Sequence, residues 1–229
     1  IKIMINYLRS ILRYFHTIRY LKFIQIISRL KNYFKRTKIN NLKAKKLNKV
    51  VGLWVRPARR SQRMLGGRKF RFLNKMNEIT QIKDWNRKEL GKLWLYNLHY
   101  FDDLNSKDSE NRINWHQALI QKWIVENPIG IGVGWDSYPI SLRIVNWIKW
   151  HLACNGLSQS ALDSLAVQTR YLSKNLETHL LGNHFFSNAK ALTFAKFTKI
   201  ICERPTQEAE VAIIQSLPEK HGVLRPPGT

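Results

Sequence analysis

The sequence predicts an all-α protein, an array of antiparallel helical hairpins that follows a basic helical N-terminal extension. Three observations support this fold class. Apolar residues recur at helical spacing after Asn105, and proline or glycine stands where helices should begin or end. The charge is also divided unevenly: residues 1–100 hold 26 Lys/Arg and 3 Asp/Glu (26 − 3 = +23), whereas residues 101–229 hold 13 and 12 (13 − 12 = +1). A hydrophobic content of 44% indicates a folded chain.

The first 30 residues predict one or two amphipathic helices with a solvated basic face. Arg and Lys interrupt the apolar run every few residues, so it lacks the apolar core of a signal peptide and is too charged to span a bilayer. The alternative is a helix that binds a membrane surface or a polyanion. Residues 31–63, rich in Lys, Arg and Asn, predict a linker or a frayed helix.

The elements that follow are predicted in chain order. "KFRFLNKMNEI", which begins at Lys69, alternates weakly and predicts a short strand. Four helices come next: one ends at Asn127-Pro128, one opens at Pro139, one spans roughly Gln159–His179, and one begins near Asn183. The third should bury the apolar face formed by Leu162, Leu165, Ala166, Thr169, Leu172 and Leu176.

The helix that opens at Pro139 carries a polar and aromatic side. Arg143, Asn146, Trp147 and Trp150 stand at i, i+3, i+4 and i+7 and therefore share one face. Indole rings stack on the apolar face of a sugar, and Arg and Asn bond hydroxyl or carboxylate groups, so this face suits sugar binding. A helix–helix contact with half-buried tryptophans is the alternative interpretation.

Two loops carry residues that other kinds of site also use. "NPIGIGVGWDSYP" lacks the Gly-Lys-Ser/Thr ending of a phosphate loop, and its glycines instead predict a close approach to a ligand by Trp135, Asp136 and Tyr138. "NLHYFDD" offers His99, Asp102 and Asp103 without a second cluster at matching spacing, so we favour a structural role and predict no metal site.

Gly182-Asn183-His184 lies within the apolar stretch "LETHLLGNHFFSNAKAL". A buried Asn or His usually satisfies backbone groups. At a helix start, however, Asn183 can cap the helix or direct its amide outward beside the positive end of the helix dipole. Such a position suits a carboxylate ligand.

Three ordered stretches, "LWLYNLHYFDDLN", "WIVENPIGIGVGWDSYPISLRIVNWIKW" and "HLLGNHFFSNAKAL", resemble the N-terminal region of heparinase II/III-type polysaccharide lyases. The resemblance reaches to about residue 200. It implies an incomplete α/α toroid followed by a β-sandwich. The predicted organisation is a basic extension over residues 1–68, a partial toroid over 69–202 and a divergent tail over 203–229.

The resemblance also implies a reaction, β-elimination at a uronic acid of an acidic polysaccharide, which needs no cofactor. Asn183 matches the residue that neutralises the substrate carboxylate, and His184 matches its neighbour in the cleft. The sugar subsites are expected to include Trp135, Asp136, Tyr138, Arg143, Asn146 and Trp147. An anionic membrane surface is a second predicted partner, through residues 1–60, and no zinc-finger, RNP or helix-turn-helix motif indicates a specific nucleic acid.

The sequence departs from this family after about Cys202. A catalytic Tyr and a further His are expected downstream of Asn183-His184, yet no Tyr follows Tyr171, and His221 lies in a Pro- and Gly-rich context. We therefore expect residues 1–229 to be catalytically incomplete, as after a truncation or a frameshift. The resemblance implies a periplasmic or cell-envelope location, although no signal peptide is visible.

Overall fold

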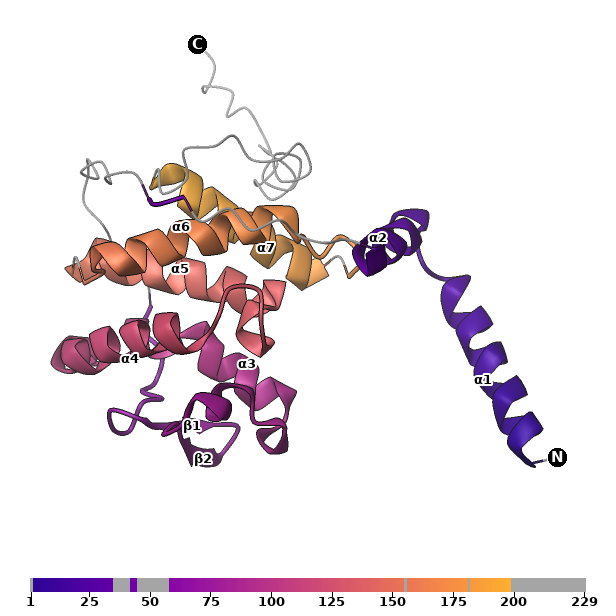
Figure 1. Cartoon of the computed structure of the whole chain (residues 1–229), viewed down its shortest axis with the longest axis horizontal. Helices are drawn as coiled ribbons and strands as arrows, with labels where there is room; N and C mark the ends of the chain where they lie inside the picture. The colour runs from indigo at the N-terminus through magenta and orange to yellow at the C-terminus, as the bar shows by residue number, and fades with distance from the viewer. Residues whose placement is uncertain (1, 35–41, 45–57, 155, 181, 199–229) are drawn as a thin grey trace, which may run out of the picture.

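The computed structural model describes residues 2–34, 42–44, 58–154, 156–180 and 182–198, and over these ranges the protein is predominantly helical (Figure 1). The predicted helical class is confirmed, with a small two-stranded hairpin added to it. Most of the predicted linker, together with the predicted tail over residues 203–229, lies outside the described residues.

The elements follow one another along the chain with short connections. The helices and strands are α1 (Lys2–Ile18), α2 (Phe23–Phe34), β1 (Lys69–Phe72), β2 (Lys75–Glu78), α3 (Lys92–Tyr100), α4 (Ile113–Glu126), α5 (Ser137–Cys154), α6 (Gln159–Lys174) and α7 (Gly182–Phe197). Short 3₁₀ helices join them: η1 (Ile82–Asn86), η2 (Lys88–Leu90), η3 (Asp102–Asn105), η4 (Ser109–Arg112) and η5 (Val133–Trp135).

The helix positions agree with the sequence prediction except at one end. Helix α4 stops at the predicted Asn127, and all six predicted core positions of the third helix are buried. That third helix, α6, ends at Lys174 rather than near His179, which corrects the prediction. The physical reason is Asn175, whose side-chain amide donates to the carbonyl of Tyr171 and whose backbone has left the helical region (φ −128°, ψ 49°).

Helix α5 lies at the centre of the fold, and α7 runs parallel to it. Tyr138 contacts His184 near the start of both helices, and Ser141 accepts a hydrogen bond from Asn188 one turn later. Helix α3 also runs parallel to α5. Lys92 at the start of α3 pairs with Asp136, the residue before α5, and the carbonyl of Tyr100 at the end of α3 accepts from Asn146 in the middle of α5. The N-termini of α3, α5 and α7 therefore lie at one end of the molecule.

Helices α4 and α6 run in the opposite direction and cover α5. Trp123 near the end of α4 packs on Trp147 of α5, whereas His116 near the start of α4 packs on Trp150. Gln121 of α4 accepts a hydrogen bond from Ser160 of α6, so these two helices lie beside one another. The described body is thus a set of alternating helices in which α3, α5 and α7 share one direction.

The hairpin packs against α3. Strands β1 and β2 are antiparallel with Phe72 opposite Lys75, and the connecting Leu73 and Asn74 both have positive φ (52° and 60°), as in a type I′ turn. Phe72 then meets Trp94 of α3 edge to face at 5.2 Å between centroids. The predicted short strand is therefore confirmed, and its partner strand follows at once.

Residues 58–68, which the sequence prediction places in the N-terminal extension, contact the body directly. Met64 is completely buried, and the backbone N–H groups of Arg63 and Met64 both donate to Asp103. Arg59 pairs with Glu110 at 2.9 Å.

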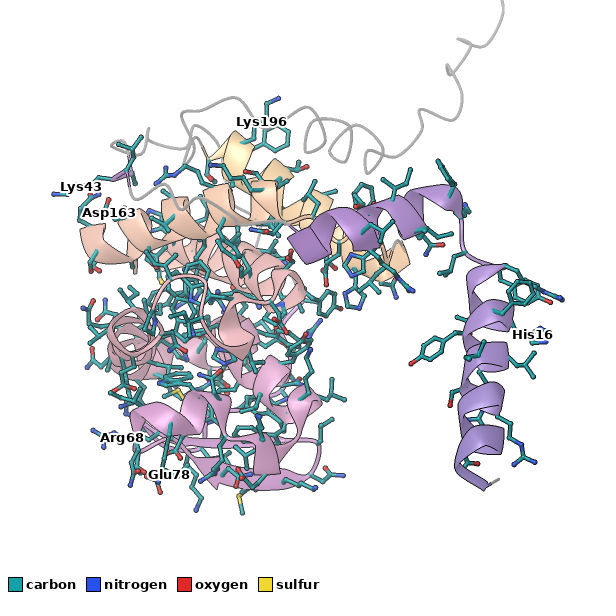
Figure 2. All side chains as sticks on the ribbon, turned by 45° about the vertical axis from the view of Figure 1, so that its right-hand side comes forward. His16, Lys43, Arg68, Glu78, Asp163 and Lys196 are labelled. Carbon is teal, nitrogen blue, oxygen red and sulfur yellow. The ribbon has the colours of Figure 1, made fainter. Side chains whose placement is uncertain are left out.

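Helix α1 projects away from the body, whereas α2 touches it (Figure 1). Gln25 of α2 donates to the carbonyl of His179, and Thr178 donates to Ser28. The side chains of α1 that the structure describes, His16 among them, extend into solvent (Figure 2). No helix within the described ranges is both long and apolar enough to cross a membrane.

Candidate functional site

The predicted catalytic pair lies where α5 and α7 begin. The ring of His184 lies on that of Tyr138, with 4.3 Å between centroids and a 35° interplanar angle. Gly182 has a φ of +54°, which glycine adopts readily, and it starts α7. Asn183 is the second residue of α7, so it lies inside the first turn and is not the cap of the helix. Its side chain is exposed. The structure thus brings three predicted residues, Tyr138, Asn183 and His184, to one surface.

Glu177 fixes the orientation of His184. The imidazole Nδ1 lies 3.0 Å from Glu177 Oε1, and the Glu177 side chain is only 12% exposed. Asn188 holds Glu177 in place, because it donates to Oε2 at 3.2 Å and accepts from the Glu177 backbone N–H at 2.8 Å. Within the described part of the chain Nε2 of His184 has no hydrogen-bond partner, and the side chain is 37% exposed. A ligand can therefore reach Nε2.

Two tyrosines of α3 lie next to this surface, Tyr96 half buried and Tyr100 buried. Tyr100 meets Tyr138 edge to face at 5.9 Å, and Tyr96 donates to Asp136 at 2.6 Å. Burial, followed by the hydrogen bond to Asp136, raises the pKa of Tyr96 far above its usual value. Burial also raises the pKa of Tyr100 far above its usual value, and the nearby Tyr138 adds to that shift. Both hydroxyls stay protonated at neutral pH, and that of Tyr96 donates to Asp136.

Three predicted subsite residues lie in the core instead of on this surface. Trp135 is 4% exposed, and Arg143 and Trp147 are fully buried. The guanidinium of Arg143 donates to carbonyl and amide oxygens inside the protein and lies 3.9 Å from the centroid of the Trp123 ring. Because these three side chains are buried, a sugar bound at the surface does not reach them.

The remaining two predicted residues are half buried and tied into the fold. Asp136 accepts from Tyr96 and pairs with Lys92 at 3.2 Å. Asn146 donates to the carbonyl of Tyr100 and to Asp102. Asp136 therefore lies at the start of α5, next to α3, whereas Asn146 lies farther along α5.

The residues of "NLHYFDD" are held by the protein itself. His99 accepts from Trp123 Nε1 at Nδ1, so its Nε2 donates to the carbonyl of Trp85, and burial lowers its pKa to about 3. Asp103 binds Arg112 and His116. Across the described ranges, no three His, Cys, Asp or Glu side chains are grouped as metal ligands would be.

Glu177 and Asn188 were not singled out from the sequence, although both contribute to the site. A signal for Asn188 was present: it stands four residues after His184 and therefore on the same face of α7. Glu177 offered only its charge, because the turn that brings it back to α7 is not visible in a helical pattern.

Comparisons with protein-family models, with curated proteins and with solved structures found no match.

Proposed function

We propose that this chain is the N-terminal, partial-toroid region of a polysaccharide lyase and that it binds a uronate-containing polysaccharide where α5 and α7 begin. Two features of the fold support the toroid. Helices α3, α5 and α7 run in parallel, and α4 and α6 return between them. Consecutive hairpins of an α/α toroid have this alternation, with equivalent helix ends gathered at one rim.

The observation that carries the proposal is the arrangement of Glu177, His184 and Tyr138 beside the exposed Asn183. A carboxylate that holds Nδ1 of an imidazole directs Nε2 outward, and an imidazolium, which has a donor on each ring nitrogen, donates from Nε2 to an anion. The Asn183 amide is a second donor. The first turn of α7 carries no acidic residue, so the positive end of its helix dipole favours a carboxylate, whereas Asp136 already lies at the start of α5.

This arrangement has a clear use in β-elimination. The proton on C5 of a uronate is hard to remove while the neighbouring carboxylate is charged. Donors that strengthen their bonds as the enediolate-like anion forms lower that barrier. Asn183 and His184 are the proposed donors. We assign no base among the described residues, since Tyr96 and Tyr100 keep their protons.

The test is binding of a uronate oligosaccharide to Asn183→Ala. We expect an affinity loss of about tenfold or more, because a hydrogen bond to a charged group contributes roughly 1.5–3 kcal/mol. Isothermal titration calorimetry measures the loss. The melting temperature should stay unchanged, since the Asn183 side chain is exposed.

The matched control is Asn114→Ala, because Asn114 is also exposed and also second in its helix, α4. It should bind as the unmodified chain does. The same oligosaccharide with its carboxyl groups reduced to alcohols should bind weakly to every form. Equal binding of the reduced and acidic oligosaccharides, or equal losses in the two variants, would contradict the proposal.

A second candidate function, binding to an anionic membrane surface, is favoured by α1. Ile11, Leu12 and Phe15 are 52%, 51% and 65% exposed, and Arg9 and Arg13 lie beside them on the helix. No acidic residue occurs in α1 or α2. An amphipathic helix with an apolar stripe and basic flanks lies in the interface of anionic bilayers.

For this candidate, Phe15→Asp should abolish sedimentation of the chain with phosphatidylserine-containing vesicles, because a charge enters the apolar stripe. Val125→Asp is the control, since Val125 is 71% exposed on α4 and away from α1. Binding that survives Phe15→Asp, or is lost equally in Val125→Asp, speaks against α1 as the membrane contact.

A further inference from the structure

The turn of the β1–β2 hairpin and the strand after it expose apolar side chains. Leu73 in the turn is 52% exposed, and Met76 in β2 is 51% exposed. Phe70 and Phe72 of β1 instead point into the core and are 2% and 6% exposed. The hairpin lies at the edge of the body, on the side away from α6 and α7 (Figure 1). The two exposed side chains therefore belong to a turn at an edge and not to a groove.

Leucine at position 73 is unfavourable for the fold. Its φ is +52°, in the left-handed region that glycine and asparagine favour and that a bulky side chain avoids. The first central position of a type I′ turn is usually Asn, Asp or Gly for this reason. The Leu73 side chain offsets little of this strain by packing, because half of it is exposed. A residue that breaks a local rule without supporting the fold indicates a function outside the fold.

Cations surround these two apolar side chains. Residues 68–78 hold four Lys/Arg and one Asp/Glu (4 − 1 = +3), and all four cations are exposed. The Arg71 guanidinium lies 3.7 Å from Met76 Sδ, so positive charge and apolar surface are adjacent. The acidic residue, Glu78, pairs with Lys69 at the end of the hairpin opposite the turn. The surface next to the turn is therefore both apolar and basic.

We propose that the hairpin tip, which consists of Arg71, Leu73, Lys75 and Met76, inserts into the interface of an anionic lipid bilayer. Leu73 and Met76 would enter the boundary between headgroups and acyl chains. Arg71 and Lys75 have long apolar stems, so their charged ends reach the lipid phosphates while the stems lie along the apolar surface. Anionic headgroups attract such cations.

A bilayer fits the hairpin tip better than a soluble polyanion does. A polyanion in solution would pair with the cations but would leave Leu73 and Met76 in water, whereas a bilayer provides partners for both kinds of side chain. The hairpin tip belongs to the body and is separate from α1. Two contacts on one chain bind a surface more tightly than one, because the second forms at a high effective concentration. The inference goes beyond polysaccharide binding and adds a contact to the membrane candidate.

The first experiment measures sedimentation of the whole chain with vesicles of phosphatidylserine and phosphatidylcholine. Leu73→Asn should weaken vesicle binding about fivefold or more, because it removes an apolar side chain from the membrane contact. The melting temperature should not fall, since asparagine tolerates a positive φ in this turn. Loss of binding in a variant that folds at least as well separates a membrane contact from a structural role.

The matched control is Val125→Asn, because Val125 is also an exposed apolar residue, at 71%, but lies on α4. It should sediment as the unmodified chain does. Phe15→Asp reports on α1 and Leu73→Asn on the hairpin tip, so failure of either contact is read separately. Unchanged binding in Leu73→Asn, equal losses in Leu73→Asn and Val125→Asn, or no sedimentation of the unmodified chain overturns the proposal.

The second experiment tests insertion directly. Met76→Cys, in a chain with Cys154→Ser and Cys202→Ser, carries a nitrobenzoxadiazole label whose emission shifts to shorter wavelength in an apolar environment. Vesicles that contain phosphatidylserine should produce this shift, and soluble dextran sulfate should not. The same label on Val125→Cys should not respond to either. A label that stays in water while the chain sediments, or an equal shift with dextran sulfate, overturns insertion of the hairpin tip.

Discussion

Replacing Arg143 with methionine is expected to lower the free energy of unfolding by about 3–5 kcal/mol. The guanidinium is fully buried and donates to Gln168 Oε1 at 2.8 Å, to the Gly134 carbonyl at 2.9 Å and to the His99 carbonyl at 3.2 Å. Methionine fills much of the volume but donates nothing, so these buried acceptors lose their partner. The contact with the Trp123 ring is lost as well.

Urea denaturation followed by tryptophan fluorescence measures this change. Arg143→Lys should not restore stability, because a single ammonium group does not reproduce the planar fork of donors. Arg68→Met is the matched control: Arg68 is exposed next to the hairpin (Figure 2), so its replacement should change stability by less than about 0.5 kcal/mol. A loss below about 1 kcal/mol for Arg143→Met would show that the interior rearranges around the gap.

The second large effect is expected for Asp103→Asn, again about 3–5 kcal/mol. Asp103 is 6% exposed and receives the backbone N–H groups of Arg63 and Met64 at 2.6 and 3.0 Å. The same carboxylate pairs with Arg112 at 3.1 Å and with His116 at 2.9 Å. The variant keeps the shape of the side chain but leaves the buried Arg112 without its counter-charge.

The pH dependence of stability gives an independent readout of this carboxylate. Burial alone would raise the pKa of Asp103, but the hydrogen bond from His116, the two backbone N–H groups and the charge of Arg112 together lower it from 3.8 to about 2. A lowered pKa means that the stabilisation is complete above the unfolded value and is lost as the pH falls toward 2. The wild-type chain should thus lose about 2 kcal/mol more than Asp103→Asn between pH 5 and pH 2.

The control for this second prediction is Asp108→Asn, because Asp108 is exposed five residues farther along the chain. It should leave both the stability at neutral pH and the acid limb of the profile unchanged. An acid limb that is identical in the wild-type chain and Asp103→Asn would contradict the role given to Asp103.

The local sequence pattern was sufficient to predict where the helices lie, but not to predict the role of every residue on them. The spacing of apolar residues placed α4, α5 and the buried face of α6. The same spacing placed Arg143 and Trp147 on one side of α5. An exposed sugar-binding face and a contact between helices have the same sequence pattern, so the spacing does not distinguish them. The structure covers that side with α3 and α4, and both side chains are buried.

By itself, the sequence determined the helical class, the order and approximate limits of the helices after residue 105, and the separation of the basic first 100 residues from the nearly neutral remainder. Only the tertiary structure decided that Tyr138 meets His184, that Glu177 orients the imidazole, and that Asp103 holds residues 63 and 64. The physical reason is that periodicity reports which residues share a face within one segment. Which neighbour covers that face depends on how several helices pack together, through contacts between residues far apart in the chain.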